Sequence, residues 1–555
     1  MIRISIVFVL SCLVVSGLFQ QHSNPSENTT EKKYIVIAVT FGTRSHAKSM
    51  LYIGEEMTKR GHEVVYMATQ TAIQFAKGFN IPTVPLKIPP DVRSLKFFAS
   101  NMVDKDVLIS NGHSDEEIKK MEDEMIETRK RMTGHMSVID SLSAVINLLS
   151  ANEPYELAVF GLLDAFERRK PDLVICDYMI FACMDVCAHL NISYVITVRT
   201  MALMGHPDFP NYIPDPIIGR SFFSITLWER LYDKFILGPQ FLLRLRPVFQ
   251  HMNTIRTKYG LKTYYNPETN IVNCHILLTN FFGWDIPYLM SPFIHTVGPI
   301  VGRIELGKTI PNDLFHWLEE AKELNESVVY VAFGSIAIPS RDQIQIFLDG
   351  FSMSSSCDLH ARKQEPHLRV LWSLSGISIT DFPMESTKKL EGLNVRFEQW
   401  VPQLNVLTHA AVKLFLTHGG MESVHESLYA GKPSLIVPFF GDQQSNALLS
   451  RDRGVADFLD KNTMTSIDVC KKVHKLLTDY DNTSSELYRN LYKMSRIVHH
   501  NLNNYKHIYK VLEMEMDIGS QHLIPPSVSW LVAHNVDLWV IFLAIIWIVI
   551  YVTRF

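Results

Sequence analysis

Short apolar runs separated by helical stretches dominate this chain of 555 residues. The first run, YIVIAVT, covers Tyr34–Thr40, and a helical pattern over Lys48–Arg60 leads to a second run at Val64–Ala68. A strand that is apolar at every position, rather than at every second position, is buried on both faces. Strands of this kind that alternate with helices predict a parallel β-sheet covered by helices on both sides.

The pattern occurs in two series, which predicts two doubly wound, Rossmann-like α/β domains that face a cleft. A stretch rich in Gly and Pro, from Val297 to Pro311, separates the two series. Hydrophobic residues make up 47% of the chain, which is enough for two packed cores. The other strands that we expect are Leu173–Cys176 and Val195–Val198 in the first series, and Val328–Phe333, Val370–Ser373, Val395–Phe397, Leu414–Leu416 and Leu435–Val437 in the second.

The first twenty residues have the pattern of a secretory signal peptide. Arg3 precedes an apolar run from Ile4 to Phe19, with small residues at Ser16 and Gly17. A charged start, a short apolar stretch and small residues near its end are typical of such a signal. The alternative is a buried strand or helix at the N-terminus. We therefore expect residues 1–20 to be removed from the mature protein.

An uncharged apolar run near the C-terminus, Leu538–Thr553, predicts a transmembrane helix over residues 536–553. A helix of 16 residues is about 24 Å long, against about 30 Å for a hydrocarbon core. Aromatic residues in the run would extend the match into the interface, and Arg554 would lie on the cytosolic side. A buried C-terminal helix is the alternative.

The two ends together predict a single-pass, type I protein of the endoplasmic reticulum membrane with lumenal domains. Four glycosylation sequons agree with this topology, at Asn28, Asn191, Asn325 and Asn482. An even number of cysteines after signal removal permits disulfides, but their irregular spacing and apolar neighbours predict buried free thiols instead. These cysteines, whose spacing matches no zinc site, are Cys176, Cys183, Cys187, Cys274, Cys357 and Cys470.

The densest group of polar residues lies between Trp400 and Ala447. A predicted strand ends just before His418, Gly419 and Gly420, and a helix follows at once. The two glycines let backbone N–H groups approach an anion, and the helix N-terminus adds its dipole. His418 can donate to the same phosphates, and Glu426, nearly two turns into the helix, can accept hydrogen bonds from ribose hydroxyls.

Two further pairs complete a predicted nucleotide-sugar site. Asp442 and Gln443 follow the next strand and offer a carboxylate and an amide to sugar hydroxyls. Trp400 and Gln403 follow the strand at Val395–Phe397 and offer a stacking ring and an amide to a planar base. Each residue alone is common in turns or on surfaces. Their order and spacing over 48 residues indicate one site.

This segment closely resembles the signature of family 1 UDP-glycosyltransferases. The shared elements are W-x-P-Q, then T-H-G-G-x-x-S-x-x-E, a proline, and D-Q-x-x-N. Residues 519–530 also look like the stretch before the anchor in animal membrane-bound members, the UDP-glucuronosyltransferases. The resemblance, which runs over most of residues 33–553, implies the GT-B fold. It also implies an N-terminal acceptor-binding domain (33–294), a C-terminal UDP-sugar-binding domain (295–475), and C-terminal helices (476–535) that pack back on the N-terminal domain.

Carried over position by position, the resemblance implies how the donor is held. Glu422 departs from the family pattern, because many members have a small or amide residue there. A carboxylate beside a diphosphate is repulsive, so we expect the Glu422 side chain to turn away. The implied contacts are Trp400 and Gln403 with the uracil, Glu426 with the ribose, Asp442 and Gln443 with the hexose, and Gly334, Ser335, His418, Gly419, Gly420 and Ser423 with or near the diphosphate.

The N-terminal domain is expected to supply the catalytic base. The segment FGTRSH ends in His46, and the family alignment makes this residue the base. An imidazole suits the task because its pKa lies near the working pH. Asp177, at the end of a predicted strand, matches the carboxylate that orients the base. The resemblance implies inverting transfer of a hexosyl group to a hydroxyl, without a metal or another cofactor.

Other chemistries have less support. The D-x-D pattern at Asp479-Tyr480-Asp481 is typical of metal-dependent glycosyltransferases, but it lies in a polar stretch beside a sequon, where a solvated loop is expected. The sequence contains no P-loop, G-x-S-x-G or H-E-x-x-H motif. Two rival classes stay open: a nucleotide-sugar epimerase on the same fold, and a non-catalytic binding protein.

The sequence leaves the donor sugar and the acceptor open. The Asp442-Gln443 pair suits glucose, glucuronate or galactose, of which the first two are the leading candidates. Residues 97–149 and 201–249 are rich in Met, Phe and Leu, which suits a small lipophilic acceptor such as a phenol, steroid or sphingoid lipid, and equally suits a core. A net charge of −4 gives no basic field for nucleic acid. Formation of a homo-oligomer is left open.

Overall fold

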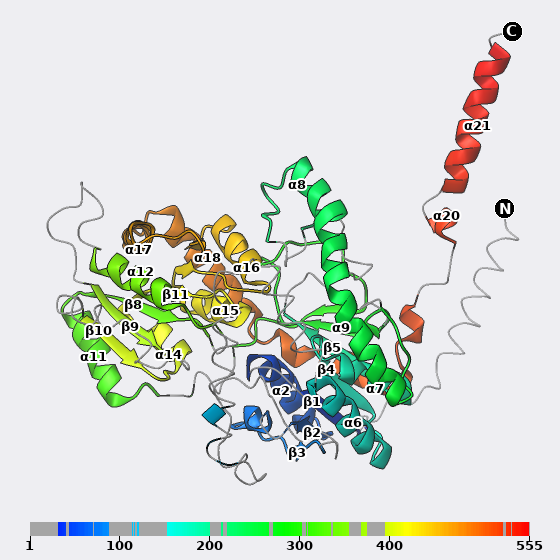
Figure 1. The fold of residues 1–555 in the computed structure, drawn as a ribbon, viewed down its shortest axis with the longest axis horizontal. Helices are drawn as coiled ribbons and strands as arrows, with labels where there is room; N and C mark the ends of the chain where they lie inside the picture. The colour runs from blue at the N-terminus through cyan, green and yellow to red at the C-terminus, as the bar shows by residue number, and fades with distance from the viewer. Residues whose placement is uncertain are drawn as a thin grey trace, which may run out of the picture.

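Two parallel sheets make up the body of the protein in this computed structural model (Figure 1). The structure describes residues 31–39, 44–69, 72–87, 153–199, 219–265, 270–301, 309–334, 337–353, 368–374, 394–524, 529–533 and 536–553, with a few single residues between them. The predicted signal peptide at 1–20, Asn28, Ser335, Cys357 and most of the Met-, Phe- and Leu-rich segments at 97–149 and 201–218 lie outside these ranges.

The first sheet has seven strands in the order β3-β2-β1-β4-β5-β6-β7. Each neighbouring pair is parallel. Its strands are β1 (Tyr34–Val39), β2 (Glu63–Ala68), β3 (Thr83–Pro85), β4 (Leu173–Asp177), β5 (Tyr194–Val198), β6 (His275–Leu278) and β7 (Ile294–Thr296). The helical segments of this half are α2 (Arg44–Lys59), η1 (Ile73–Ala76), α6 (Glu153–Arg168), α7 (Phe181–Leu190), α8 (Leu227–Tyr232), η2 (Asp233–Leu237) and α9 (Gly238–Lys258).

The second sheet has six parallel strands in the order β10-β9-β8-β11-β12-β13. Its strands are β8 (Ser327–Ala332), β9 (Leu368–Ser373), β10 (Asn394–Glu398), β11 (Val412–Thr417), β12 (Ser434–Ile436) and β13 (Ala456–Phe458). The helices around it are α11 (Asn312–Glu323), α12 (Arg341–Ser352), α14 (Gln403–Thr408), α15 (Met421–Ala430), α16 (Gln443–Asp452), α17 (Ser466–Asp481) and α18 (Glu486–Asn501). The predicted doubly wound α/β architecture is confirmed.

Both faces of the second sheet are buried, as the uninterrupted apolar strands predict. Alternate residues of β8 belong to separate core clusters: Val329 and Val331 to one, Val328 and Tyr330 to the other. Successive side chains of a strand point to opposite faces, so the two clusters lie on opposite sides of the sheet. Residues of α12, α15, α17 and α18 belong to the first cluster, and residues of α11 and α14 to the second.

Helix α2 begins earlier than the sequence pattern suggested. It starts at Arg44 rather than at Lys48, so His46 lies in the first helical turn instead of in the loop after β1. Polar residues at the start of α2 hide this turn from a search for apolar periodicity. A position on a helix holds the ring of His46 more rigidly than a loop would.

The C-terminal helices divide between the two domains. The family resemblance implied that all of 476–535 packs on the N-terminal domain, but α18 packs on the second sheet through residues such as Leu487 and Leu491. The crossing begins at η6 (Asn504–His507) and continues in α19 (Tyr509–Ile518). Tyr505 packs against Tyr52 of α2 with ring centroids 6.0 Å apart. The apolar face of α18 is buried in the core of the second domain, which explains the difference.

The end of the chain carries the apolar helix α21 (Val536–Thr553), after η7 (Gln521–Leu523) and α20 (Trp530–Ala533). None of the residues of α21, all of which the structure describes, is buried. Within the described ranges it is the one helix long and apolar enough to cross a membrane, by length and composition. In Figure 1 it stands apart from the body, at the upper right.

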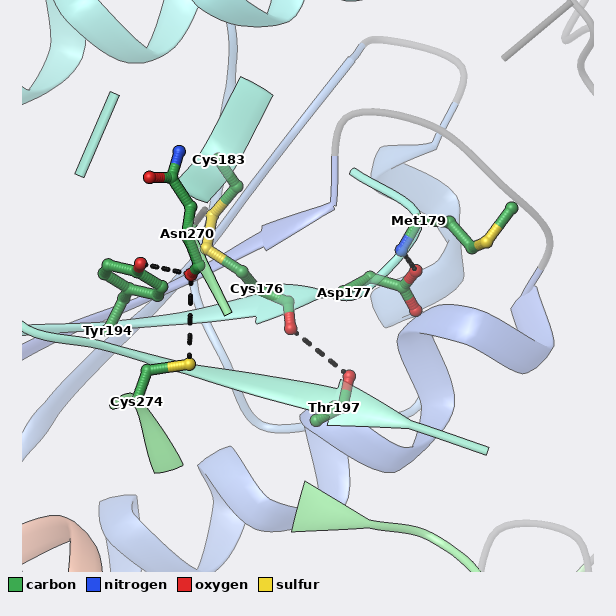
Figure 2. Close-up of a disulfide and its surroundings, with 8 residues drawn as sticks. All are labelled: Cys176, Asp177, Met179, Cys183, Tyr194, Thr197, Asn270 and Cys274. Atoms are coloured by element: carbon green, nitrogen blue, oxygen red, sulfur yellow. Dashed lines mark hydrogen bonds between the residues drawn. A yellow bond between two sulfur atoms is a disulfide. The ribbon is translucent and has the colours of Figure 1, made fainter. Parts of the chain in front are cut away.

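The prediction of free thiols is wrong for at least one pair. Cys176 and Cys183 form a disulfide, with their Cα atoms 5.8 Å apart, and Cys470 is also disulfide-bonded. Cys176 is the second-to-last residue of β4 and Cys183 lies in the first turn of α7, so the tight β4–α7 turn brings the two together (Figure 2). Cys187 and Cys274 are buried free thiols, as expected.

Candidate active site

His46 and Asp177 meet at the carboxyl ends of two neighbouring strands. β1 and β4 lie side by side, and Asp177 is the last residue of β4, while His46 follows β1 on α2. The strand order of the first sheet reverses at this pair, and ligands of open α/β sheets bind at such a point. His46 Nδ1 donates a hydrogen bond to Asp177 Oδ2 over 2.8 Å.

This hydrogen bond sets the tautomer of the His46 ring. A carboxylate only accepts, so the proton lies on Nδ1, and Nε2 keeps its lone pair for a base reaction. The other oxygen of Asp177, Oδ1, accepts from the backbone N–H of Met179 over 2.8 Å (Figure 2). Asp177 is buried, whereas the His46 side chain is 28% exposed, so an acceptor can reach the ring.

The environment keeps Asp177 ionised. Burial opposes the charged carboxylate, but the charge and hydrogen bond of His46, the charge of Arg199 and the Met179 N–H outweigh it. The pKa of Asp177 therefore lies below its ordinary value of 3.8. An ionised Asp177 stabilises the imidazolium that forms when His46 takes up a proton.

The second sheet places His418 at the corresponding point, where β8 and β11 are neighbours. His418 follows β11, and α15 begins after Gly420. A Cβ on Gly334 would lie 2.7 Å from the His418 ring, and a Cβ on Gly420 would lie 2.6 Å from Nε2. The two glycines therefore make room for this ring. Gly334 and Gly419 also adopt positive φ angles, of 71° and 84°.

His418 is neutral at physiological pH. Burial lowers its pKa to about 4, so the ring carries one N–H donor and no charge. The polar N–H groups that open α15 lie beside it, and a helix N-terminus favours an anion. His418 therefore suits hydrogen bonding to a phosphate oxygen, and the helix end supplies the electrostatic attraction.

The structure brings Gln403, Ser423 and Glu426 into one hydrogen-bonded group. Gln403 Nε2 donates to Glu426 Oε2 over 2.8 Å and to Ser423 Oγ over 3.3 Å. The Tyr330 hydroxyl donates to Gln403 Oε1 over 3.3 Å. Trp400, after β10, is 55% exposed and offers a ring face for stacking. Ser423 thus lies beside the predicted base and ribose residues rather than apart from them.

Asp442 and Gln443 open helix α16, and a third residue holds them there. Asn446 Nδ2 donates to Asp442 Oδ2 over 3.0 Å and to the Gly419 carbonyl over 2.9 Å. Asn446 is the last letter of the D-Q-x-x-N pattern, but the sequence analysis assigned it no role. Gln443 Oε1 accepts from two backbone N–H groups, those of residues 439 and 440, so only its Nε2 is left to donate to a ligand.

Asp442 is within electrostatic range of His46 and Arg199 of the other domain. Burial raises the pKa of Asp442, while the hydrogen bond from Asn446, the charge of Arg199 and the electrostatic influence of His46 act in the opposite direction. Arg199 and His46 both belong to the first domain. The predicted hexose residue and the predicted base are therefore within electrostatic range of each other across the domain interface.

Two ion pairs join helix α15 to the first domain. Lys48 Nζ lies 3.4 Å from Glu426 Oε1, and both side chains are buried. Arg199, after β5, lies 3.8 Å from Glu422 Oε1. Glu422 and Glu426 are four residues apart, so they share one face of α15. The Glu422 charge, which we expected to turn away from the diphosphate, is thus paired with a cation.

A neutral contact completes this interface. His425 Nε2 and Asn280 Oδ1 are 3.1 Å apart, and both residues are buried. Burial lowers the pKa of His425 to about 3, and the charges of Lys48 and Arg199 add to the effect. Neutral His425 donates to the Asn280 oxygen. The sequence analysis missed these interface residues, because nothing in their local spacing relates one domain to the other.

We expect the His46–Asp177 pair to contribute to stability only above acidic pH. The pKa of Asp177 is lower in the folded than in the unfolded chain, so the contribution is present above about pH 4 and is lost as pH falls through the folded value. Urea unfolding at pH 3 to 6 should show Asp177→Asn less stable by about 1–3 kcal/mol at pH 6. The difference should shrink toward pH 3.

The exposed Asn462→Ala change, which removes no titratable group, serves as the control for this measurement. Its stability relative to the wild type should stay constant over the same range. A difference between wild type and Asp177→Asn that stays constant from pH 6 to pH 3 would contradict the assignment of an ionised Asp177.

Comparison with known proteins identifies the family of this chain. The sequence model of the family described as UDP-glucoronosyl and UDP-glucosyl transferase matches residues 33–554. UDP-glucuronosyltransferase 2B9 of Macaca fascicularis is 24% identical over 532 residues, which cover 92% of this chain and 90% of that protein. UDP-glycosyltransferase FPY2 of Fusarium mangiferae is 24% identical over 452 residues, covering 71% and 79%.

Solved structures share the fold. A structure titled as the glycotransferase of kitacinnamycin superposes with a TM-score of 0.55 at 15% identity, covering 88% of this chain and all of that one. CalG4, the calicheamicin glycosyltransferase, gives a TM-score of 0.54 at 16% identity, covering 87% and 98%. These likenesses establish the predicted GT-B fold. The chain therefore belongs to the UDP-glucuronosyl and UDP-glucosyl transferase family, and it is a UDP-glycosyltransferase that takes its sugar from a UDP-sugar.

Proposed function

We propose that this enzyme transfers glucose or glucuronate from its UDP-sugar to a hydroxyl of a small lipophilic acceptor, with inversion at the anomeric carbon. The observation that carries the proposal is the hydrogen bond between His46 and the buried Asp177. His46 Nε2 takes the proton of the acceptor hydroxyl, and Asp177 stabilises the resulting imidazolium. The acceptor oxygen then forms a bond to the anomeric carbon.

The bond from the anomeric carbon to the diphosphate breaks in the same step, and its electron pair passes to the departing UDP. The negative charge that builds up there is met by the N-terminus of α15 and by an N–H of neutral His418. We propose that these groups make a divalent cation unnecessary. A single displacement from the face opposite UDP converts an α-linked donor into a β-glycoside.

We propose that the Trp400–Gln403 and Asp442–Gln443 pairs of the donor domain divide the donor between them. Trp400 stacks on the uracil, and Gln403 and Glu426 hold the base and ribose. Asp442 accepts from hexose hydroxyls close to His46, which places the anomeric carbon near the base. Asn446 fixes Asp442 in this position.

We also propose that α21 anchors the enzyme in the endoplasmic reticulum membrane with both domains in the lumen. The length, apolar composition and full exposure of α21 support the anchor. Three sequons, at Asn191, Asn325 and Asn482, are exposed and accessible to glycosylation. A disulfide between Cys176 and Cys183 also suits an oxidising compartment.

Product analysis with His46→Ala tests the proposed reaction. Membranes that contain the wild-type enzyme should release UDP from UDP-glucose or UDP-glucuronate, but not from UDP-galactose, when a pool of phenols and steroids is present, and should form a β-glycoside. We expect His46→Ala to lower kcat at least 100-fold while UDP binding is kept. Release without an acceptor, an altered free nucleotide sugar, or full activity of the variant would contradict the proposal.

The change Gly420→Ala tests the room kept for the His418 ring. The φ angle of Gly420 is −61°, which alanine adopts freely, so the added methyl acts only through its contact with the ring. We expect UDP to bind about tenfold more weakly by titration calorimetry, because the ring must move. Added to His418→Ala, the same change should have little effect. Equal losses in both backgrounds would rule out this explanation.

Lys48→Met tests the ion pair with Glu426. Without the ammonium, a buried carboxylate stands uncompensated beside the anionic donor, so we expect the KM for UDP-sugar to rise about tenfold with a smaller change in kcat. Lys48→Arg should restore part of the loss. Lys59→Met, on the exposed part of the same helix, is the matched control. An unchanged KM with only a lower melting temperature would show that Lys48 acts on stability alone.

A further inference from the structure

The helical segments α8, η2 and α9 follow one another without a break from Leu227 to Lys258 and form one long rod (Figure 1). The second half of the rod packs into the first domain through residues such as Val248 and Met252. The first half extends away from the body and carries large apolar side chains in contact with solvent. These are Leu227, Trp228, Leu231, Tyr232, Phe235, Ile236, Leu242 and Leu243.

We call these eight residues the apolar stripe, because they repeat at an interval that keeps them on one side of the rod. The pairs 227/228, 231/232 and 235/236 follow one another every four residues. In an α-helix a step of four residues advances the side chain by about 40°, so a long repeat of this kind would drift around the helix.

The π-helical turn η2 (Asp233–Leu237) corrects this drift. A π-helix has more residues in each turn, so a step of four falls short of a full turn instead of passing it. The angular displacements in the α-helical and π-helical parts have opposite signs and offset each other. Phe235 therefore stays in line with Leu227 and Leu231. A π-turn is rare and often marks a functional site. Here its effect is to align an exposed apolar stripe.

Basic side chains outnumber acidic ones in the first half of the rod and the segment before it, which favours contact with an anionic surface. Residues 220–246 contain five basic and two acidic side chains, in a chain whose net charge is −4. Both acidic residues are paired: Arg220 lies 3.2 Å from Glu229 and 3.3 Å from Asp233. Glu229 also caps the start of α8 together with Thr226. The remaining charges that flank the stripe are therefore positive.

The position of α21 identifies the surface that the stripe meets. Ile524, at the end of the described body, and Val536 are twelve residues apart, so the linker spans at most about 40 Å. In Figure 1 the free end of the rod and the start of α21 both lie at the top of the molecule. A bilayer that holds α21 is thus within reach of the stripe, and the lumenal domains cannot move far from it.

We propose that the apolar stripe lies in the interface of the same bilayer that α21 crosses, as a second, monotopic membrane contact of the acceptor domain. An apolar face flanked by basic residues, with Trp and Phe among its members, is typical of an interfacial helix. The inference rests on the proposed anchoring by α21. This contact holds the acceptor domain at the membrane surface. Lipophilic acceptors dissolved in the bilayer can then enter the enzyme directly from the membrane.

Lipid-borne quenchers test the contact on the full chain. Single Trp228→Cys, Phe235→Cys and Leu243→Cys variants carry an environment-sensitive fluorophore and are reconstituted into phosphatidylcholine–phosphatidylserine bilayers that contain doxyl-labelled lipid. Leu289→Cys is the matched control, since Leu289 is 96% exposed and lies off the stripe. Ile546→Cys in α21 reports the anchor. The labelled wild type gives the background from native cysteines.

We expect at least twofold stronger quenching at 228, 235 and 243 than at 289, with shallow doxyl groups the most effective, and deep quenching at 546. Quenching at 546 alone would overturn the interfacial contact and leave the anchor intact. Quenching at the stripe alone would overturn the anchor instead. Energy transfer between labelled copies without lipid quenching would show that a second copy of the chain covers the stripe, which also overturns the proposal.

Discussion

The hydrogen bond between His46 and Asp177 depends on β1 and β4 lying side by side in a parallel sheet. Parallel strands end at one edge, so residues that follow different strands meet there although 131 positions separate them. The second sheet repeats this arrangement with β8 and β11, which places Gly334 against the ring of His418. In both domains these candidate site residues lie where the strand order reverses.

Helix α15 connects these two edges. Its N-terminus opens beside Gly420, while Glu422 and Glu426 on one face meet Arg199 and Lys48 of the first domain. Burying an ion pair costs desolvation that its attraction offsets only in part, so such pairs contribute little net stability. We interpret them as setting the register of the two domains. Helix α15, which follows His418 and the two glycines, is thereby held at a defined position against helix α2, which carries His46.

Much of the fold could be predicted from the sequence, because uninterrupted apolar strands and helices have local signatures. Most strands of five or six residues in the two sheets were expected. The internal strand β6, of four residues, and the edge strands β3, β7 and β13, of three residues each, were missed, because runs of three or four residues carry little periodicity. The disulfide was missed for a different reason. Cys176 and Cys183 meet through a turn, and apolar neighbours suggested only that both are buried.

The sequence by itself determined the parallel α/β architecture and the donor motif. The residues from Trp400 to Asn446 follow the ends of successive strands, and such residues come together at one edge of a parallel sheet. Only the tertiary structure decided what pairs with these residues. Lys48 reaches Glu426 across 378 positions, and His425 of the second domain meets Asn280 of the first. Such pairings depend on how the two sheets face each other. The spacing of residues along one segment of the chain carries no information about that arrangement.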